Sequence, residues 1–131
     1  MLKVKIWDTA GVEKNANIIG SYVRKLDACF MVFDLTSRDS FDGVRRWIKQ
    51  LYEQTSVPVV IVGNKYDLTE ERQVSPEQLA DLGRHYGVHT FETSAKTGHN
   101  VDSAFACLIY QVLKPCIIVR EHIKADSVLG D

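Results

Sequence analysis

The 131-residue sequence lacks the features that would mark a membrane-spanning or secreted protein. Its apolar stretches, such as Ala28 to Phe33 and Val59 to Val62, fall far below the roughly 20 residues that a membrane-spanning helix needs. No basic segment followed by an apolar one opens the chain, as a secretion signal would require. We therefore expect an intracellular, cytoplasmic protein without a transmembrane segment.

An excess of one charge sign is also absent, because 16 Lys and Arg residues stand against 17 Asp and Glu residues. With a net charge of -1, nothing favours a nucleic-acid partner or a strongly acidic membrane, and any such contact would be local. Cysteine is scarce, and Cys29, Cys107 and Cys116 do not have the close spacing of a metal-ligating pair. They predict reduced thiols rather than a disulfide or a zinc site.

Four segments have the patterns of β-strands. Alternating apolar residues predict a half-exposed strand at Leu2 to Trp7. Continuous apolar runs predict strands covered on both faces at 28–33 and 59–62, and residues 90–93 predict a further short strand.

Helical patterns lie between and after these strands. Apolar stripes predict helices over 41–52 and 101–113. A third helix is predicted to start at Ser75, whose hydroxyl is followed by Pro76 and Gln78, and to end at Gly87. Strands that alternate with helices predict an open α/β sheet with helices on both faces.

Polar loops follow three of the predicted strands, at 8–11, 63–67 and 92–96. Each loop alone is typical of an ordinary surface turn. In a parallel sheet, however, the carboxyl ends of the strands meet at one edge, where ligands bind. The three loops together therefore predict a ligand site.

In this order and spacing, the loops resemble three of the five nucleotide-contacting motifs of small GTPases. The matching runs are Trp7-Asp8-Thr9-Ala10-Gly11, Asn64-Lys65-Tyr66-Asp67 and Thr93-Ser94-Ala95-Lys96. Between them, Met31-Val32-Phe33-Asp34-Leu35-Thr36 and Asp39-Ser40-Phe41 are similar to the Rab branch. The resemblance runs from Leu2 to Leu113 and implies a P-loop NTPase-like three-layer sheet that binds GTP or GDP with Mg²⁺.

The resemblance assigns base recognition to the second and third loops. Asp67 would accept the adjacent N1–H and amino donors of guanine, which adenine does not offer. Asn64 would tie the loops together, and the aliphatic stems of Lys65 and Lys96 would flank the base. The Ala95 N–H would donate to the guanine carbonyl.

The remaining implied roles concern Asp67 itself and the phosphates. Ser94 would steady Asp67. Asp8 would hold Mg²⁺ through water, and the Gly11 N–H would sense the γ-phosphate. Residues from Gly11 to about Lys25 would form the second switch.

Three departures from the family pattern limit these expectations. The 131 residues contain no phosphate-binding run G-x-x-x-x-G-K-S/T, so we expect an incomplete GTPase domain at 1–114 without the first strand, first helix and second strand. The strands at 2–7 and 28–33 would then either pair directly or leave a fragment that is unstable alone. Val12 stands where the family carries the glutamine that orients the attacking water, so no catalytic residue is assigned.

The third departure is residues 115–131, an expected C-terminal extension without the terminal cysteines of a prenylation site. Three interpretations remain. The first is a Rab-like guanine-nucleotide-binding switch protein of vesicle traffic that binds GTPase regulators or effectors and lies at endomembranes only through such partners. The second is a nucleotide-independent interaction module, and the third is a non-functional fragment. Whether the chain is an enzyme stays open.

Overall fold

The computed structural model describes residues 1–9 and 23–114. Its centre is a parallel sheet of three strands, β1 (Cys29–Asp34), β2 (Val59–Asn64) and β3 (His89–Glu92), in the order β1-β2-β3. Helix α2 (Arg38–Tyr52) connects β1 to β2. The short 3₁₀ helix η1 (Thr69–Glu71) and helix α3 (Pro76–Tyr86) connect β2 to β3, and residues 101–114 form a further helix.

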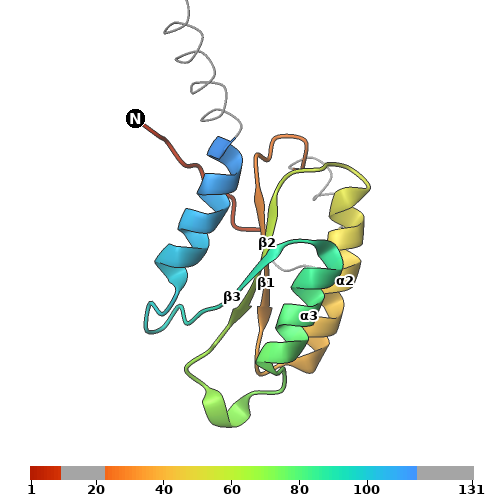
Figure 1. Ribbon diagram of the computed structural model, residues 1–131, viewed down its shortest axis with the longest axis vertical. Helices are drawn as coiled ribbons and strands as arrows, with labels where there is room; N and C mark the ends of the chain where they lie inside the picture. The colour runs from red at the N-terminus through yellow and green to blue at the C-terminus, as the bar shows by residue number, and fades with distance from the viewer. Residues whose placement is uncertain (10–22, 115–131) are drawn as a thin grey trace, which may run out of the picture.

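The helices cover both faces of the sheet, with α2 and α3 on one side and the helix at 101–114 on the other (Figure 1). Alternate side chains of β2 point to opposite faces. Ile61 accordingly belongs to a core with residues of α2 and α3, whereas Val60 and Val62 pack with Ala104 and Leu108. The predicted α/β class with helices on both faces is confirmed.

Side-chain caps set where α2 and α3 begin. The Ser37 hydroxyl accepts a hydrogen bond from the Ser40 N–H at 3.3 Å and caps α2. Ser75 and Gln78 form a reciprocal capping box at α3, in which each side chain accepts from the other residue's backbone N–H. Gly87 ends α3 in the left-handed conformation with φ of 65°. The start and end predicted for this helix are confirmed.

The strand predicted at Leu2 to Trp7 is wrong. Residues 1–9 have no regular secondary structure, and their side chains are exposed, as in Ile6 at 68%. A strand needs a neighbouring backbone to satisfy its N–H and C=O groups, and none of the described strands pairs with this segment. The direct pairing considered between this segment and β1 is therefore not formed. One edge of β1 has no described partner, and Val32 on this strand is 62% exposed.

Two smaller expectations can be checked within the described residues. Cys29 and Cys107 are free thiols, as predicted, whereas Cys116 lies outside the described part of the chain. In 1–9 and 23–114 no helix is long and apolar enough to cross a membrane. The expected extension at 115–131 also lies outside the described residues.

Candidate functional site

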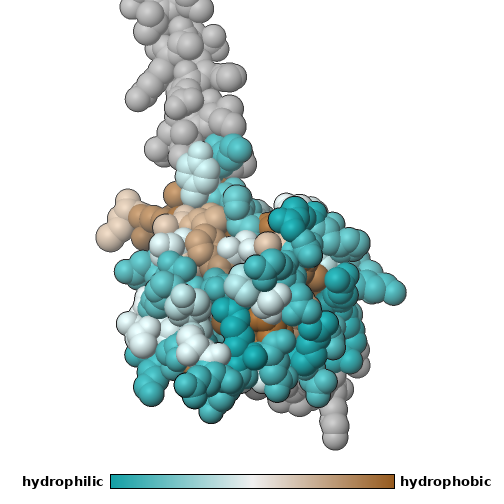
Figure 2. All heavy atoms as spheres, turned by 60° about the horizontal axis from the view of Figure 1, so that its bottom comes forward, coloured by the Kyte–Doolittle hydropathy of each residue, from teal (hydrophilic) through white to brown (hydrophobic). Residues whose placement is uncertain are grey.

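The loops after β2 and β3 meet at one edge of the sheet. The strands run parallel and in register, with Asp34 beside Asn64 and Gly63 beside Glu92, so their carboxyl ends are level. Figure 2 brings this lower edge of Figure 1 forward and shows a surface that is hydrophilic over most of its area. Two of the three predicted polar loops are therefore brought together.

Asn64 connects the two loops through its side-chain oxygen. Its Oδ1 accepts a hydrogen bond from the Ala95 N–H at 3.0 Å and another from the Thr93 hydroxyl at 3.1 Å. The backbone adds two links, because the Thr93 N–H donates to the Gly63 carbonyl and the Tyr66 N–H donates to the Thr93 carbonyl. The loops thus hold one another in place. The Ala95 N–H, predicted to meet a guanine carbonyl, is engaged by Asn64 in this arrangement.

Ser94 orients Asp67 from a buried position. Ser94 is 0% exposed, and its hydroxyl donates to Asp67 Oδ1 at 2.7 Å while accepting from the Thr97 N–H at 3.1 Å. Within the described part of the chain, Ser94 is the side chain that donates to Asp67. Asp67 is half-buried. Hydrogen bonds to a charged group are stronger than neutral ones, so this contact fixes the carboxylate orientation.

The ammonium group of Lys65 pairs with Asp34, a contact that the sequence did not predict. Its ammonium group lies 2.8 Å from Asp34 Oδ2, and its backbone is left-handed with φ of 69°. The other Asp34 oxygen accepts from the N–H and hydroxyl of Thr36 at 2.8 and 2.7 Å. Burial of Asp34 acts to raise the pKa of its carboxyl, but hydrogen bonds from Lys65 and Thr36 outweigh burial and hold that pKa below its usual value. The Asp34 carboxylate reciprocally raises the pKa of Lys65.

A ring stack further joins the two loops, and a side-chain hydrogen bond ties the second loop to the end of β3. The rings of Tyr66 and His99 are stacked with centroids 4.5 Å apart and an interplanar angle of 15°. Asn100, which is also left-handed, donates from its side-chain amide to the Glu92 carbonyl at 3.1 Å. No local sequence signal distinguishes these residues from ordinary loop residues, because their contacts depend on the register between β2 and β3.

Lys96, predicted to flank the base, is exposed in the loop after β3, beside Ala95. On the phosphate side, Asp8 is exposed in the segment without regular structure. Gly11 and Val12 lie outside the described residues. Residues 1–9 and 23–114 contain no group of three or more His, Cys, Asp or Glu side chains that could hold a metal ion. Of the predicted site residues, the structure therefore brings together Asn64, Asp67, Ser94 and Ala95.

Comparison with known proteins points to one family. The Ras family profile matches residues 1–114. Human Ras-related protein Rab-37 is 35% identical over 136 residues, which is 96% of this chain and 61% of the relative. Rat Ras-related protein Rab-26 is 40% identical over 109 residues, 82% of this chain and 42% of that protein. Bovine Ras-related protein Rab-8A is 42% identical over 109 residues, 82% of this chain and 53% of that protein. The chain thus spans about half the length of these curated relatives.

Proposed function

The chain belongs to the Ras family, and we propose that it is a Rab-like protein of vesicle traffic whose described residues recognise the guanine base of GTP or GDP. The observation that carries this proposal is the cross-linked pair of loops at the carboxyl edge of the sheet. Two hydrogen bonds support it, from the buried Ser94 hydroxyl to the Asp67 carboxylate and from the Ala95 N–H to Asn64 Oδ1. In the whole protein, GTPase regulators or effectors would be the partners, on the cytoplasmic side of endomembranes.

Asp67 supplies the base selectivity. Guanine presents its N1–H and amino group side by side, and a carboxylate can accept from both at once. Adenine offers an acceptor at N1 and would leave the carboxylate without that donor pair. Because Ser94 already holds Asp67 Oδ1, the carboxylate does not have to be ordered when the base arrives.

Asn64, Ala95 and the two lysines shape the rest of the base site. The Ala95 N–H is exposed enough to turn from Asn64 Oδ1, or to be shared with it, when a guanine carbonyl approaches. The ion pair with Asp34 holds the Lys65 ammonium group away from the base, so that its aliphatic stem can cover one face. Lys96 would cover the opposite face.

The residues on the phosphate side contribute less to the proposed nucleotide site than the base-recognition loops do. Asp8 would reach Mg²⁺ only through water, and Gly11 would contact the γ-phosphate. With Val12 at the position of the water-orienting glutamine, we expect slow intrinsic hydrolysis even in a chain with a complete phosphate site. A branched hydrocarbon neither donates to nor accepts from water.

A second candidate function is a nucleotide-independent interaction module. The loop contacts favour it, because Asn64 already satisfies the Ala95 N–H and Asp34 already neutralises Lys65. Such loops keep their shape without a nucleotide. In this case the helical surfaces would carry the function by binding the partners of active relatives.

Ligand-observed NMR on the full chain separates the two candidates. Guanosine and adenosine are compared by saturation transfer, since nucleosides do not require a phosphate site. We expect transfer to guanosine and little to adenosine, with the preference lost in Asp67→Asn because an amide cannot accept from both donors. Glu70→Gln, a neighbouring exposed carboxylate, is the matched control. Equal transfer to both nucleosides, or a preference that survives Asp67→Asn, would refute the base site.

A further inference from the structure

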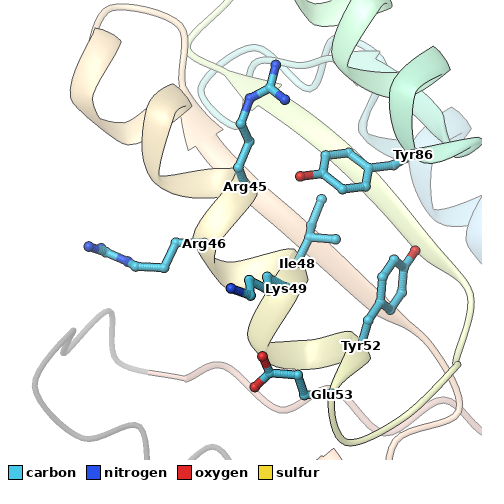
Figure 3. Close-up of a pocket in the computed structure, with 7 residues that line it drawn as sticks. All are labelled: Arg45, Arg46, Ile48, Lys49, Tyr52, Glu53 and Tyr86. Atoms are coloured by element: carbon cyan, nitrogen blue, oxygen red, sulfur yellow. The ribbon is translucent and has the colours of Figure 1, made fainter.

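A hollow of about 640 Å³ lies between α2 and α3, away from the loops that we assign to the base (Figure 3). It is a broad, open depression on the surface rather than an enclosed cavity. Its lining comes from α2 and the residue that caps it, together with one residue of α3. These are Arg45, Arg46, Ile48, Lys49, Tyr52, Glu53 and Tyr86.

The floor of the hollow is apolar. The Ile48 side chain lies between the rings of Tyr52 and Tyr86, which come from different helices (Figure 3). Ile48 is 0% exposed and belongs to the core beneath the hollow, whereas Tyr52 is 41% exposed and offers accessible aromatic surface. Exposed aromatic rings over a packed core suit an apolar side chain of a partner, because they offer large contact area at little entropic cost.

The rim of the hollow carries unneutralised positive charge. Arg45, Arg46 and Lys49 are all exposed, and Arg45 and Lys49 share one face of α2 because they are four residues apart. Among residues 1–9 and 23–114, no carboxylate forms a salt bridge with any of these three cations. Four other cations in these ranges are paired with carboxylates, and six are not. The paired ones are Arg38, Lys65, Arg72 and Arg84, and the unpaired ones are Lys3, Lys5, Arg24, Lys25, Lys96 and Lys114. Glu53 is the one acidic residue of the lining, so the hollow has a local positive charge in a chain whose net charge is -1.

We infer that this hollow binds an acidic segment of a partner protein, with an apolar or aromatic side chain on the floor and flanking carboxylates at Arg45 and Lys49. The apolar floor has no use in binding a phosphorylated lipid headgroup. An acidic peptide uses both the floor and the cationic rim. This surface goes beyond base recognition and does not depend on it.

The location of the hollow leaves the polar loops uncovered. Helix α2 starts at the carboxyl edge of the sheet, and Ile48 lies ten residues after its first residue, Arg38. At 1.5 Å per residue this is about 15 Å along the helix. A segment in the hollow can therefore be bound together with a ligand at the loops.

Selection of random heptapeptides displayed on phage against the immobilised full chain tests the inference without assuming a partner sequence. We expect enriched peptides to contain several acidic residues beside one aromatic or leucine residue. Binding of a synthetic copy should weaken at least tenfold in Arg45→Glu/Lys49→Glu, and it should weaken with rising salt because the rim is exposed. Lys114→Glu, which reverses an exposed charge on the helix of the opposite sheet face, should leave the affinity within about twofold.

A second variant tests the apolar floor separately. Tyr52→Ser removes an exposed ring and leaves the rim charges in place, so affinity should fall several-fold while the unfolding temperature stays close to that of the wild type. Three outcomes would overturn the inference. The first is a selection in which acidic peptides are not enriched. The second is an equal loss of peptide affinity in the rim variant and in Lys114→Glu. The third is rim-dependent binding to phosphatidylcholine vesicles that contain phosphatidylinositol bisphosphate that is stronger than binding to any peptide.

Discussion

Replacing Ser94 by alanine is predicted to destabilise the chain although it removes a single oxygen atom. The hydroxyl is buried, donates to Asp67 Oδ1 at 2.7 Å and accepts from the Thr97 N–H at 3.1 Å. Loss of a hydrogen bond to a charged group costs about 1.5–3 kcal/mol. Because Asp67 is only half-buried, water recovers part of this loss, and we expect a net cost of about 1–2 kcal/mol. For a domain of this size, that cost lowers the melting temperature Tm by roughly 3–10 °C.

Differential scanning calorimetry of the full chain measures this change. Ser103→Ala is the matched control, because Ser103 is exposed on the helix at 101–114 and its loss leaves no buried partner. We expect the control to stay within about 2 °C of the wild type. If Ser94→Ala had the same Tm as the control, the Ser94–Asp67 contact would not order the loops. The Asp67 carboxylate would then not be preformed.

Three further predictions concern other parts of the structure. Asp34→Ala should lower Tm at pH 7, and the Tm difference from the wild type should narrow as the pH falls below about 4. The reason is that a carboxyl group with a depressed pKa stabilises the fold only while it is ionised. A Tm difference that does not change with pH would contradict this prediction. Burial raises the pKa of the Cys29 thiol from 9.0 to about 11. At pH 8, mass spectrometry should therefore show that Cys29 is alkylated roughly ten- to a hundredfold more slowly in the folded chain than in the urea-unfolded chain. Equal alkylation rates in the two states would contradict this prediction. Gly83→Ala should cost about 1–3 kcal/mol in denaturant unfolding, since its Cβ would lie 2.5 Å from Thr90 Cγ2, whereas Gly43→Ala meets nothing within 4 Å and should be neutral or stabilising.

Much of the fold follows from local patterns in the sequence. The apolar runs at 28–33 and 59–62 become β1 and β2 within one or two residues. β2 is covered on both faces as expected, but the same expectation for β1 is wrong, because Val32 is 62% exposed. The capping residues Ser75 and Gly87 locate α3 because their roles are local. Leu2 to Trp7 shows the limit of this reasoning. Its alternation expresses a local preference, but a strand also requires a partner, which no local pattern reveals.

The site was predictable in its location but not in its contacts. The polar loops could be placed at one edge because parallel strands share a direction, and the Asn64–Ala95 link and the Ser94–Asp67 contact lie there. The Lys65–Asp34 ion pair and the stack of Tyr66 on His99 were missed. The ion pair joins the end of β1 to the loop after β2, and the stack joins the loops after β2 and β3. Both depend on strand register and on a left-handed lysine backbone, neither of which is visible in the sequence.

We propose that the loops after β2 and β3 form a guanine-recognition surface. The decisive experiment is titration of the ¹⁵N-labelled full chain with guanosine, followed by amide chemical shifts. We expect shifts concentrated at Lys65, Asp67, Ala95 and Lys96, with far smaller changes for adenosine at the same concentration. Shifts that are absent, that lie mainly elsewhere, or that are equal for the two nucleosides would contradict it.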